Sequence, residues 1–186
     1  MSSHDTAGSR TAVRRKDRAV DDDAWIADLL GRAPVGYLAT VADGQPFINS
    51  NLFVYDPGRS AIYLHTARQG RTRSNIEGEA RVCLSVGEMG RLLPASTALE
   101  FSVEYGGVTV FGTARIVAHP EEAAHGLQLL LDKYFPHLRP DEHYRGITPE
   151  ELARTGVFRI DIEEWSGKRK VAAADFPGAF TYPYGG

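Results

Sequence analysis

The sequence predicts a mainly β fold of the α+β class, a small barrel of antiparallel strands with a few helices packed outside it. Six or seven short runs of apolar or alternating residues are separated by turn residues, which is typical of strands joined by hairpins. Helical periodicity is confined to a few segments. No Gly-x-Gly-x-x-Gly or Walker loop stands between a strand and a helix, which argues against a parallel nucleotide-binding sheet.

Composition and charge are those of a globular protein with one domain. Of the 186 residues, 42% are hydrophobic and 24% are charged, which is enough to bury a sizeable core. The net charge of -3 gives no reason to expect nucleic acid or a membrane as a partner. Cys83 is the single cysteine, so an internal disulfide is excluded. No run approaches the roughly 18 apolar residues of a membrane helix and no signal-peptide core is present, so we expect a cytoplasmic protein.

Three parts of the chain differ in character. Residues 1–20 are polar and lack any apolar period, which predicts a disordered or loosely docked arm. Residues 21–175 contain the helical and strand patterns and are expected to form the domain. Residues 176–186 are rich in proline, glycine and aromatic residues and predict an irregular tail.

The first half of the domain predicts a helix followed by four strands. Three aspartates at residues 21–23 precede apolar residues at helical spacing, which predicts a short helix stopped by Gly31 and Pro34. Asp43 and Gly44 predict a tight hairpin turn after the first strand. Residues 72–77 predict one or two helical turns. The four strands are expected over residues 35–41, 46–55, 61–66 and 81–86.

The second half is less regular. Residues 88–98 are expected to be irregular, and residues 99–117 to be strand-like with an interruption at Gly106 and Gly107. Those two glycines predict either a hairpin or one long strand with a bulge. Further elements are expected as a helix from Pro120 to Pro136, a capping box at 148–151, and a last strand over 157–162 that precedes Trp165–Lys168.

One strand end and the loop after it gather groups that suit an anion. The strand over residues 61–66 ends in His65 and Thr66, and Arg68, Arg71 and Arg73 follow around a glycine. Free backbone N–H groups at a strand-to-helix turn, together with fixed positive charge, are what a phosphate site needs. The alternative is a strand that ends in a solvated basic turn.

Polar side chains on the neighbouring strands favour a binding site over a solvated basic turn. Asn49 and Asn51 share one face of their strand, and Tyr63 shares a face with His65. Amides, an aromatic surface and arginines suit a ligand with a polar planar ring at one end and a phosphate at the other. The same face could instead pack on a second subunit, and the two interpretations are compatible.

Other catalytic patterns are missing from the sequence. Gly-x-Ser-x-Gly is absent, and the six histidines form no His-Glu-x-x-His pair, so neither a serine hydrolase elbow nor a metal site is expected.

Within residues 24–171, four sequence motifs are informative by their order and spacing. They are Gly36–Val41, Ile62–Ala67, Val108–Arg115 and Trp165–Lys168. Together they resemble the pyridoxamine 5'-phosphate oxidase-like family of FMN-binding split barrels, and the last two resemble its branch of nitroimidazole-resistance (Nim) proteins. The resemblance implies a six-stranded split barrel that forms a homodimer with FMN at the subunit interface. It also favours one long strand at Gly106.

The resemblance assigns roles to individual positions. Residues 49–52 would lie along the flavin ring edge, residues 64–67 would reach the ring and ribityl chain, and a histidine at position 65 sits near the flavin in the Nim branch. Trp165 and Lys168 match a segment that reaches the site from the second half of the chain or from the partner subunit. The implied cofactor-binding residues are Asn49, Ser50, Asn51, Leu52, Leu64, His65, Thr66, Ala67, Arg71, Arg73, Trp165 and Lys168, with Arg71 and Arg73 at the phosphate.

The sequence departs from the family pattern in three places, which limits how far the family's residue roles apply to this chain. Arg71 stands where the family often has lysine, which keeps the charge and adds a bidentate donor. Gly107 stands where the Nim-like pattern usually has serine. The tail over residues 176–186 has no arginine or histidine of the kind that true pyridoxamine-phosphate oxidases use for their substrate, which argues against vitamin B6 oxidation.

The resemblance therefore implies an FMN-dependent oxidoreductase. It would pass electrons from a reduced nicotinamide to a small planar acceptor such as a nitroaromatic or a quinone. His65 would act as a hydrogen-bond donor or proton source near the ring, and the alternative is a structural histidine. Two other functions stay open: a haem-binding split barrel, and a non-catalytic binder of flavin or of deazaflavin F420.

Overall fold

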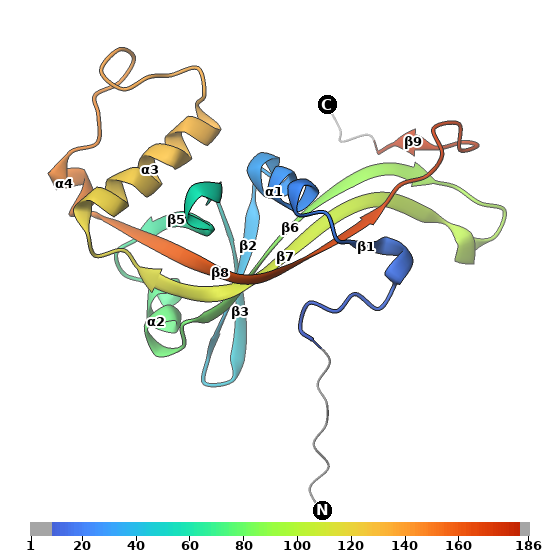
Figure 1. The fold of residues 1–186 in the computed structure, drawn as a ribbon, viewed down its shortest axis with the longest axis horizontal. Helices are drawn as coiled ribbons and strands as arrows, with labels where there is room; N and C mark the ends of the chain where they lie inside the picture. Colours follow the sequence, from blue (N-terminus) through green and yellow to red (C-terminus); the bar gives the residue numbers. More distant parts are fainter. Residues whose placement is uncertain (1–8, 183–186) are drawn as a thin grey trace, which may run out of the picture.

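The computed structural model describes residues 9–182, and its strands form one antiparallel sheet that curves into a barrel (Figure 1). The order across the sheet is β3-β2-β6-β7-β8-β5-β4. The predicted mainly β class with few helices is confirmed. The strands of this path are β2 (Gly36–Ala42), β3 (Gln45–Asn51), β4 (Phe53–Asp56), β5 (Ala61–Ala67), β6 (Arg81–Leu93), β7 (Ser102–Ile116) and β8 (Thr155–Lys170).

The chain passes from one end of this path to the other through a single residue, Leu52. β3 pairs with β2, whereas β4 pairs with β5. The prediction of one strand over residues 46–55 is therefore wrong at Leu52, because the strand must exchange partners there. Alternation of burial also fails at this point, since Phe53 and Val54 are both buried. β3 and β4 act as one bent strand, so six strands make up the barrel.

The exchange of partners leaves backbone groups that a side chain satisfies. The Tyr134 hydroxyl accepts the Phe53 N–H at 3.1 Å and lies 3.0 Å from the Phe53 carbonyl oxygen. Buried backbone groups need such partners, because an unpaired one costs as much as a lost hydrogen bond. Tyr134 is the last residue of α3 (Pro120–Tyr134), so this helix is tied to the bend in the barrel wall.

The hairpin and the first helix form as predicted. Asp43 and Gly44 both have positive φ, 51° and 76°, and make the two-residue turn between β2 and β3. α1 (Asp23–Arg32) is capped by the Asp22 carboxylate, which accepts the backbone N–H groups of the first turn. Its buried residues are Ile26, Leu29 and Leu30, which join the core inside the barrel.

Two long strands occupy most of residues 81–116. The prediction that residues 88–98 are irregular is wrong as far as Leu93, where β6 ends, whereas β7 confirms the alternative of one long strand that the resemblance favoured. Gly106 pairs in register with Glu88. A Cβ on Gly106 would lie 2.7 Å from the Glu88 carboxylate, so this glycine allows a close side chain and does not make a turn. The register shift against β8 lies instead between Phe111 and Gly112.

β6, β7 and β8 extend beyond the barrel on the side opposite α3, at the right of Figure 1. β8 runs to Lys170, so Trp165–Lys168 belong to the strand that was predicted to end at Ile162. Two short strands pair along this extension: β1 (Ala19–Val20) with β8, and β9 (Phe180–Thr181) with β6. β9 and its pairing lie within the tail predicted as irregular; residues 183–186 lie outside the described residues.

The predicted N-terminal arm is described only from residue 9, and residues 1–8 lie outside the described residues. Lys16–Arg18 form one turn of 3-10 helix, η1, directly before β1. Arg10 donates hydrogen bonds to Glu163 and Glu164 of β8 at 2.7 and 3.0 Å. Residues 9–20 therefore lie along the barrel wall.

Two short helices complete the domain. α2 (Arg71–Gly78) follows β5 in the place predicted for a helical turn, and α4 (Pro149–Leu152) precedes β8. The predicted capping box is present: the Thr148 hydroxyl accepts the Glu151 N–H, and the Glu151 carboxylate accepts the Thr148 N–H.

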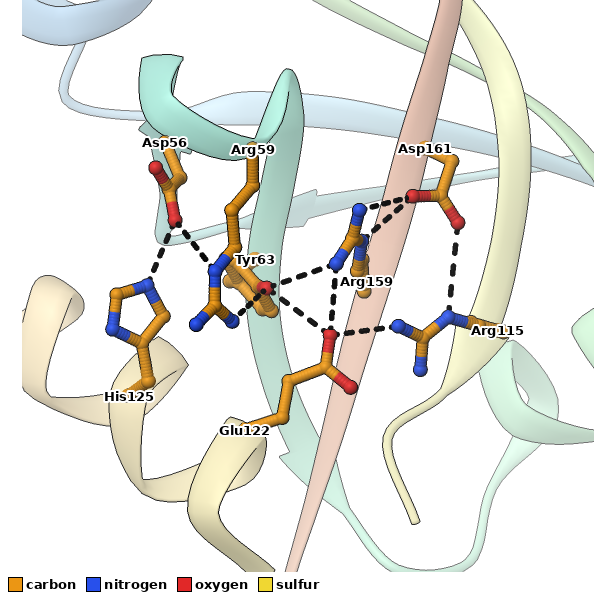
Figure 2. Close-up of polar contacts among 8 residues, drawn as sticks. All are labelled: Asp56, Arg59, Tyr63, Arg115, Glu122, His125, Arg159 and Asp161. Atoms are coloured by element: carbon orange, nitrogen blue, oxygen red, sulfur yellow. Dashed lines mark hydrogen bonds and ion pairs between the residues drawn. The ribbon is translucent and has the colours of Figure 1, made fainter. Parts of the chain in front are cut away.

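A charged network seats the first turns of α3 on the barrel (Figure 2). One carboxylate oxygen of Glu122 lies 2.7 Å from the Arg115 guanidinium, 3.0 Å from that of Arg159 and 3.2 Å from the Tyr63 hydroxyl. The guanidinium of Arg159 is also held by Asp161 at 2.6 Å. These partners come from β5, β7 and β8, so one carboxylate on α3 binds three neighbouring strands.

A second contact fixes the height of α3 above the sheet. A Cβ on Gly126 would lie 2.7 Å from the Tyr63 ring, so the helix backbone rests directly on that ring. The ring of the preceding residue, His125, lies 2.8 Å from the Asp56 carboxylate. α3 is thus held by both packing and charge.

We expect Glu122→Gln to lower the free energy of unfolding by about 2 kcal/mol at neutral pH, because two guanidinium groups lose their shared charged partner. Hydrogen bonding to Arg115, with smaller effects of Arg159 and Tyr63, holds the pKa of Glu122 at about 2, below its ordinary value of 4.5. A lowered folded-state pKa stabilises the fold above the unfolded value and loses that effect as the pH falls toward 2.

Denaturant unfolding at several pH values measures the free energy of unfolding of wild type and of Glu122→Gln. The difference between wild type and Glu122→Gln should be full at pH 6 and should shrink steadily between pH 4.5 and pH 3. Glu121→Gln, an exposed neighbour in the same helical turn, is the matched control and should leave stability within about 0.5 kcal/mol. A difference that does not change with pH would contradict the assignment.

Candidate functional site

The bend at Leu52 and the end of β5 bring most of the predicted site residues to one rim of the barrel. On β3 the two asparagines turn toward each other: the Asn51 amide donates to the Asn49 carbonyl at 3.0 Å, and Asn51 is buried. Ser50 and Leu52 lie on the outer side and are exposed. The surface that a ligand could reach on this strand is therefore made by Ser50, Leu52 and the partly exposed Asn49.

Alternation along β5 separates its residues. Leu64 is fully buried in the barrel core, so only its backbone could contact a ligand outside the barrel. His65 points to the outer side and is exposed, beside Tyr63, which α3 covers. Thr66 donates its hydroxyl to the carbonyl oxygen of Ala67 at 2.9 Å. His65 is thus the accessible side chain of this segment closest to α3.

The first turn of α2 offers donors to an anion. Gly70 has a φ of 143°, a conformation that favours glycine, and no side chain caps the helix, so its first N–H groups have no side-chain acceptor. The Arg71 guanidinium lies 5.2 Å from the centre of the Phe47 ring and has no carboxylate partner among residues 9–182. These donors fit a phosphate group.

Arg71 and Arg73 do not point into the same space. Arg73 donates to the Glu77 carboxylate at 2.9 Å and to the Arg68 carbonyl at 3.3 Å. It lines a cavity of about 470 Å³ together with Arg68, whereas Arg71 lines a separate one of about 210 Å³ beside Phe47. Residues two apart on a helix project in nearly opposite directions, which explains the separation.

Trp165 and Lys168 lie far along β8 from the β5 residues of the set, although the Trp165 ring centre is 6.0 Å from that of Tyr55 on β4. The Trp165 indole donates to the Asp23 carboxylate at 2.8 Å, and the Lys168 ammonium lies 5.6 Å from the centre of the Tyr105 ring. β8 passes Thr66 at Gly156, so Trp165 lies about 30 Å further along the strand at ~3.3 Å per residue.

An apolar cavity opens beside His65, which the sequence did not indicate. It has a volume of about 270 Å³ and lies between α3, the loop before α4, and the rim of the barrel. Its apolar walls are Leu52, Leu127, Leu130, Leu131, Phe135 and Ile147. The only sequence signal for it is that the apolar residues of α3 exceed what one face of a helix needs to cover a sheet.

The outer face of the sheet also carries apolar side chains, and the described residues cover it only in part: the Arg10 guanidinium lies 5.3 Å from the centre of the Phe111 ring. The register across β3, β2, β6 and β7 places Ile48, Ala39, Cys83 and Phe111 in one row. Ile48 is 65% exposed, and Tyr37 in the adjacent row is 52% exposed. Exposed apolar patches of this kind mark surfaces that bind partners. Burial raises the pKa of the Cys83 thiol, so this cysteine is a packing residue.

The donor set at the rim fits a flavin nucleotide. Uncapped N–H groups and the unpaired Arg71 guanidinium suit the phosphate, and Leu52, Asn49 and His65 supply apolar and polar contacts for a ring. Among residues 9–182 no group of three or more histidine, cysteine or acidic side chains could hold a metal ion. No helix within the same residues is long and apolar enough to cross a membrane.

Comparisons with solved structures find the same fold in flavin and haem proteins. A flavocytochrome from Azotobacter vinelandii has a TM-score of 0.75 at 24% identity, covering 89% of this chain and 75% of that chain. The FAD and haem binding protein from Mycobacterium smegmatis has a TM-score of 0.73 at 24% identity, covering 85% and 76%. A protein named for 5-nitroimidazole antibiotic resistance, from Bacteroides thetaiotaomicron, has a TM-score of 0.68 at 15% identity, covering 81% and 86%.

No protein with a curated description matches the sequence significantly. A family model described as pyridoxamine 5'-phosphate oxidase matches residues 22–169, which span the barrel and its helices. The resemblance seen in the sequence motifs is thereby confirmed. The chain belongs to the pyridoxamine 5'-phosphate oxidase family of split-barrel proteins.

Proposed function

We propose that the protein is an FMN-dependent oxidoreductase that passes electrons from a reduced nicotinamide to a small planar acceptor of the nitroaromatic or quinone type. The observation that carries this proposal is the segment from His65 to the first turn of α2, where an accessible histidine beside an apolar cavity is followed in sequence by uncapped N–H groups and the unpaired Arg71 guanidinium. Bound flavin accepts a hydride and returns electrons singly or in pairs, which is the chemistry such a reaction needs.

The phosphate end is assigned to the first turn of α2 and to Arg71. Its guanidinium is stacked near Phe47 and is not neutralised by any acidic side chain among the described residues. A preorganised guanidinium with two parallel donors binds phosphate more strongly than a lysine of the same charge. Arg73, which is paired with Glu77, has the smaller role.

The ring end is assigned to residues 49–52 of β3 and to residues 64–67 of β5. Leu64 and Ala67 would contribute backbone groups, since the Leu64 side chain is buried in the core. An imidazole can donate a hydrogen bond or a proton, and the exposed ring of His65 is placed to do so toward a reduced acceptor. Its imidazole has no hydrogen-bond partner among residues 9–182, which leaves both nitrogens available.

A second copy of the chain completes the proposed site. Along β8, Trp165 and Lys168 lie ~30 Å and ~40 Å from the pairing with Thr66, at ~3.3 Å per residue, so we assign their contact with the rim to a partner subunit. The exposed row with Ile48 and Cys83 is the surface we assign to the dimer. An interface there would also shield Ser50 and Leu52 from water.

Haem is the second candidate cofactor. One protein with this fold is named a flavocytochrome and another is named for FAD and haem, and the exposed imidazole of His65 is a group that can ligate iron. The second name includes FAD, which differs from FMN beyond the phosphate. The absorption spectrum of the purified protein, with the cofactor mass after denaturation, separates these cases.

Twin bands of oxidised flavin with the mass of FMN are the expected result. The mass of FAD would change the cofactor and keep the redox function. A Soret band with no flavin would overturn the proposal in favour of haem. A cofactor that is retained while reduced nicotinamide and 1,4-naphthoquinone are not consumed would point to a non-catalytic flavin binder, or to an F420 binder if the mass is that of the deazaflavin.

We expect Arg71→Ala to raise the Kd for FMN about ten- to a hundredfold, the effect of losing a charged hydrogen-bond donor worth ~1.5–3 kcal/mol. Titration of apoprotein with FMN, followed by flavin fluorescence quenching, measures the Kd. Arg73→Ala and the double variant separate the two arginines, and Arg81→Ala is a control at an exposed arginine of β6. An unchanged Kd in the double variant would rule out the phosphate assignment.

We expect Ile48→Glu to break the dimer, because it places a charge on the most exposed apolar side chain of this row, which is 65% exposed. Sedimentation should show particles of about 20.4 kDa, the chain mass, where wild type has twice that mass. Leu99→Glu adds the same charge at a site that is 94% exposed, outside this row, and should leave the mass unchanged. A wild-type protein that sediments as a monomer would overturn the assignment.

A further inference from the structure

We infer that the cavity beneath α3 is the pocket for the electron acceptor and that it selects an uncharged aromatic molecule of one or two rings. The inference deepens the proposed function and rests on it. The cavity shares Leu52 and His65 with the segments assigned to the flavin ring, so a molecule held there lies next to those segments.

Most of the walls of the cavity are aliphatic or aromatic. Leu127, Leu130 and Leu131 come from α3, Ile147 comes from the loop before α4, and Leu52 comes from the bend of the barrel. These elements are far apart in sequence, and each places an apolar side chain in the same space. Such a lining stabilises an apolar ligand by removing its surface from water.

The polar groups in the lining are already bonded, with one exception. The Tyr134 hydroxyl binds the backbone at Phe53, and the Thr155 hydroxyl donates to the Glu151 carbonyl at 2.9 Å. The Glu151 carboxylate is held by Arg145 at 2.6 Å and by the Thr148 N–H at 2.9 Å. Among the described residues, His65 is the lining side chain whose polar atoms have no partner.

This distribution determines which ligands fit. No lysine or arginine lines the cavity among the described residues, so an anionic acceptor would be buried without a counter-charge, at a high cost in free energy. A neutral molecule with a single acceptor atom can bond His65 and bury the rest of its surface. A quinone carbonyl or a nitro group supplies such an atom.

Volume sets the upper limit of size. The cavity holds about 270 Å³, which is just below the ~300–1,000 Å³ of pockets for drug-sized ligands. One or two fused rings fit this space, and a macrocycle such as haem does not fit without displacing α3. The network around Glu122 and the Tyr134 contact hold α3 at both ends, so the helix resists that displacement.

The test uses 1-naphthol, a two-ring phenol, as a probe that binds without being reduced, and isothermal calorimetry on the protein as purified. Ile147→Trp and Leu131→Trp fill the cavity and should weaken naphthol binding about tenfold or more. Leu99→Trp makes the same change at an exposed site elsewhere and should have no effect. Flavin content by absorbance is measured for each variant and should stay at the wild-type level.

Two further measurements guard against variants that fail to fold. Phe135→Ala removes a side chain that is 48% exposed at the edge of the cavity, and it should improve binding of the three-ring 9-phenanthrol relative to 1-naphthol. With 1,4-naphthoquinone as acceptor, the tryptophan variants should raise the KM about tenfold or more and leave the flavin absorbance unchanged. 1,4-Naphthoquinone-2-sulfonate, which is charged, should be a poorer acceptor than the neutral quinone.

Several outcomes would overturn the inference. Unchanged naphthol affinity in both tryptophan variants would place the ligand elsewhere, as would equal use of the sulfonated and neutral quinones. Stoichiometric binding of haemin, lost in Ile147→Trp, would assign the cavity to haem. If the protein retains no flavin, the proposed function fails, whereas naphthol binding that depends on Ile147 still establishes the cavity as a site for apolar rings.

Discussion

The bond between the Tyr134 hydroxyl and the backbone at Phe53 is the contact on which the site depends. The barrel closes only because one strand leaves β2 and joins β5, and the exchange exposes the Phe53 N–H and carbonyl. Tyr134 meets both groups at 3.1 and 3.0 Å. Since Tyr134 ends α3, closure of the barrel and placement of this helix are one event. Burial raises the pKa of the Tyr134 phenol, which keeps its proton in place as a donor.

Further contacts at both ends of α3 fix the position of this helix. At the same end of the helix, the Lys133 ammonium lies 3.3 Å from the Leu30 carbonyl and 3.9 Å from the centre of the Phe53 ring. Burial lowers its pKa to about 8, so a charged lysine at neutral pH still binds the end of α1. At the other end Glu122 binds three strands. A helix fixed at both ends is a rigid wall for the cavity beneath it, which is what a selective pocket requires.

Local sequence signals predicted the elements that local interactions determine. The turn at Asp43 and Gly44, the cap at Asp22 and the capping box of α4 depend on groups within a few residues of one another. The errors lie where distant pairing decides. β6 continues to Leu93 because β7 and β9 pair with it, and Gly106 is needed for the close approach of Glu88 from another strand. No local pattern contains that information.

In the candidate site, too, local sequence patterns could not predict contacts between distant segments. His65 and Arg71 could be named from the sequence because they stand at a strand end and in the turn after it, whereas Leu52, expected inside a strand, was named only through the family resemblance. Glu122, interpreted there as an ordinary helix start, binds Arg115 and Arg159, which lie 7 and 37 residues away in sequence. Arg71 and Arg73 were grouped by spacing, and only the helical phase of α2 separates them. The apolar cavity needed three distant segments to meet.

Assembly and cofactor binding must be coupled in a site built as proposed. A single chain leaves His65, Ser50 and Leu52 exposed, so a flavin ring bound there would have one side in water. A partner subunit that covers the ring adds contacts only when both the flavin and the dimer are present. Each therefore increases the affinity for the other by the same factor. Flavin retention should then depend on protein concentration, and the interface acts as part of the cofactor site.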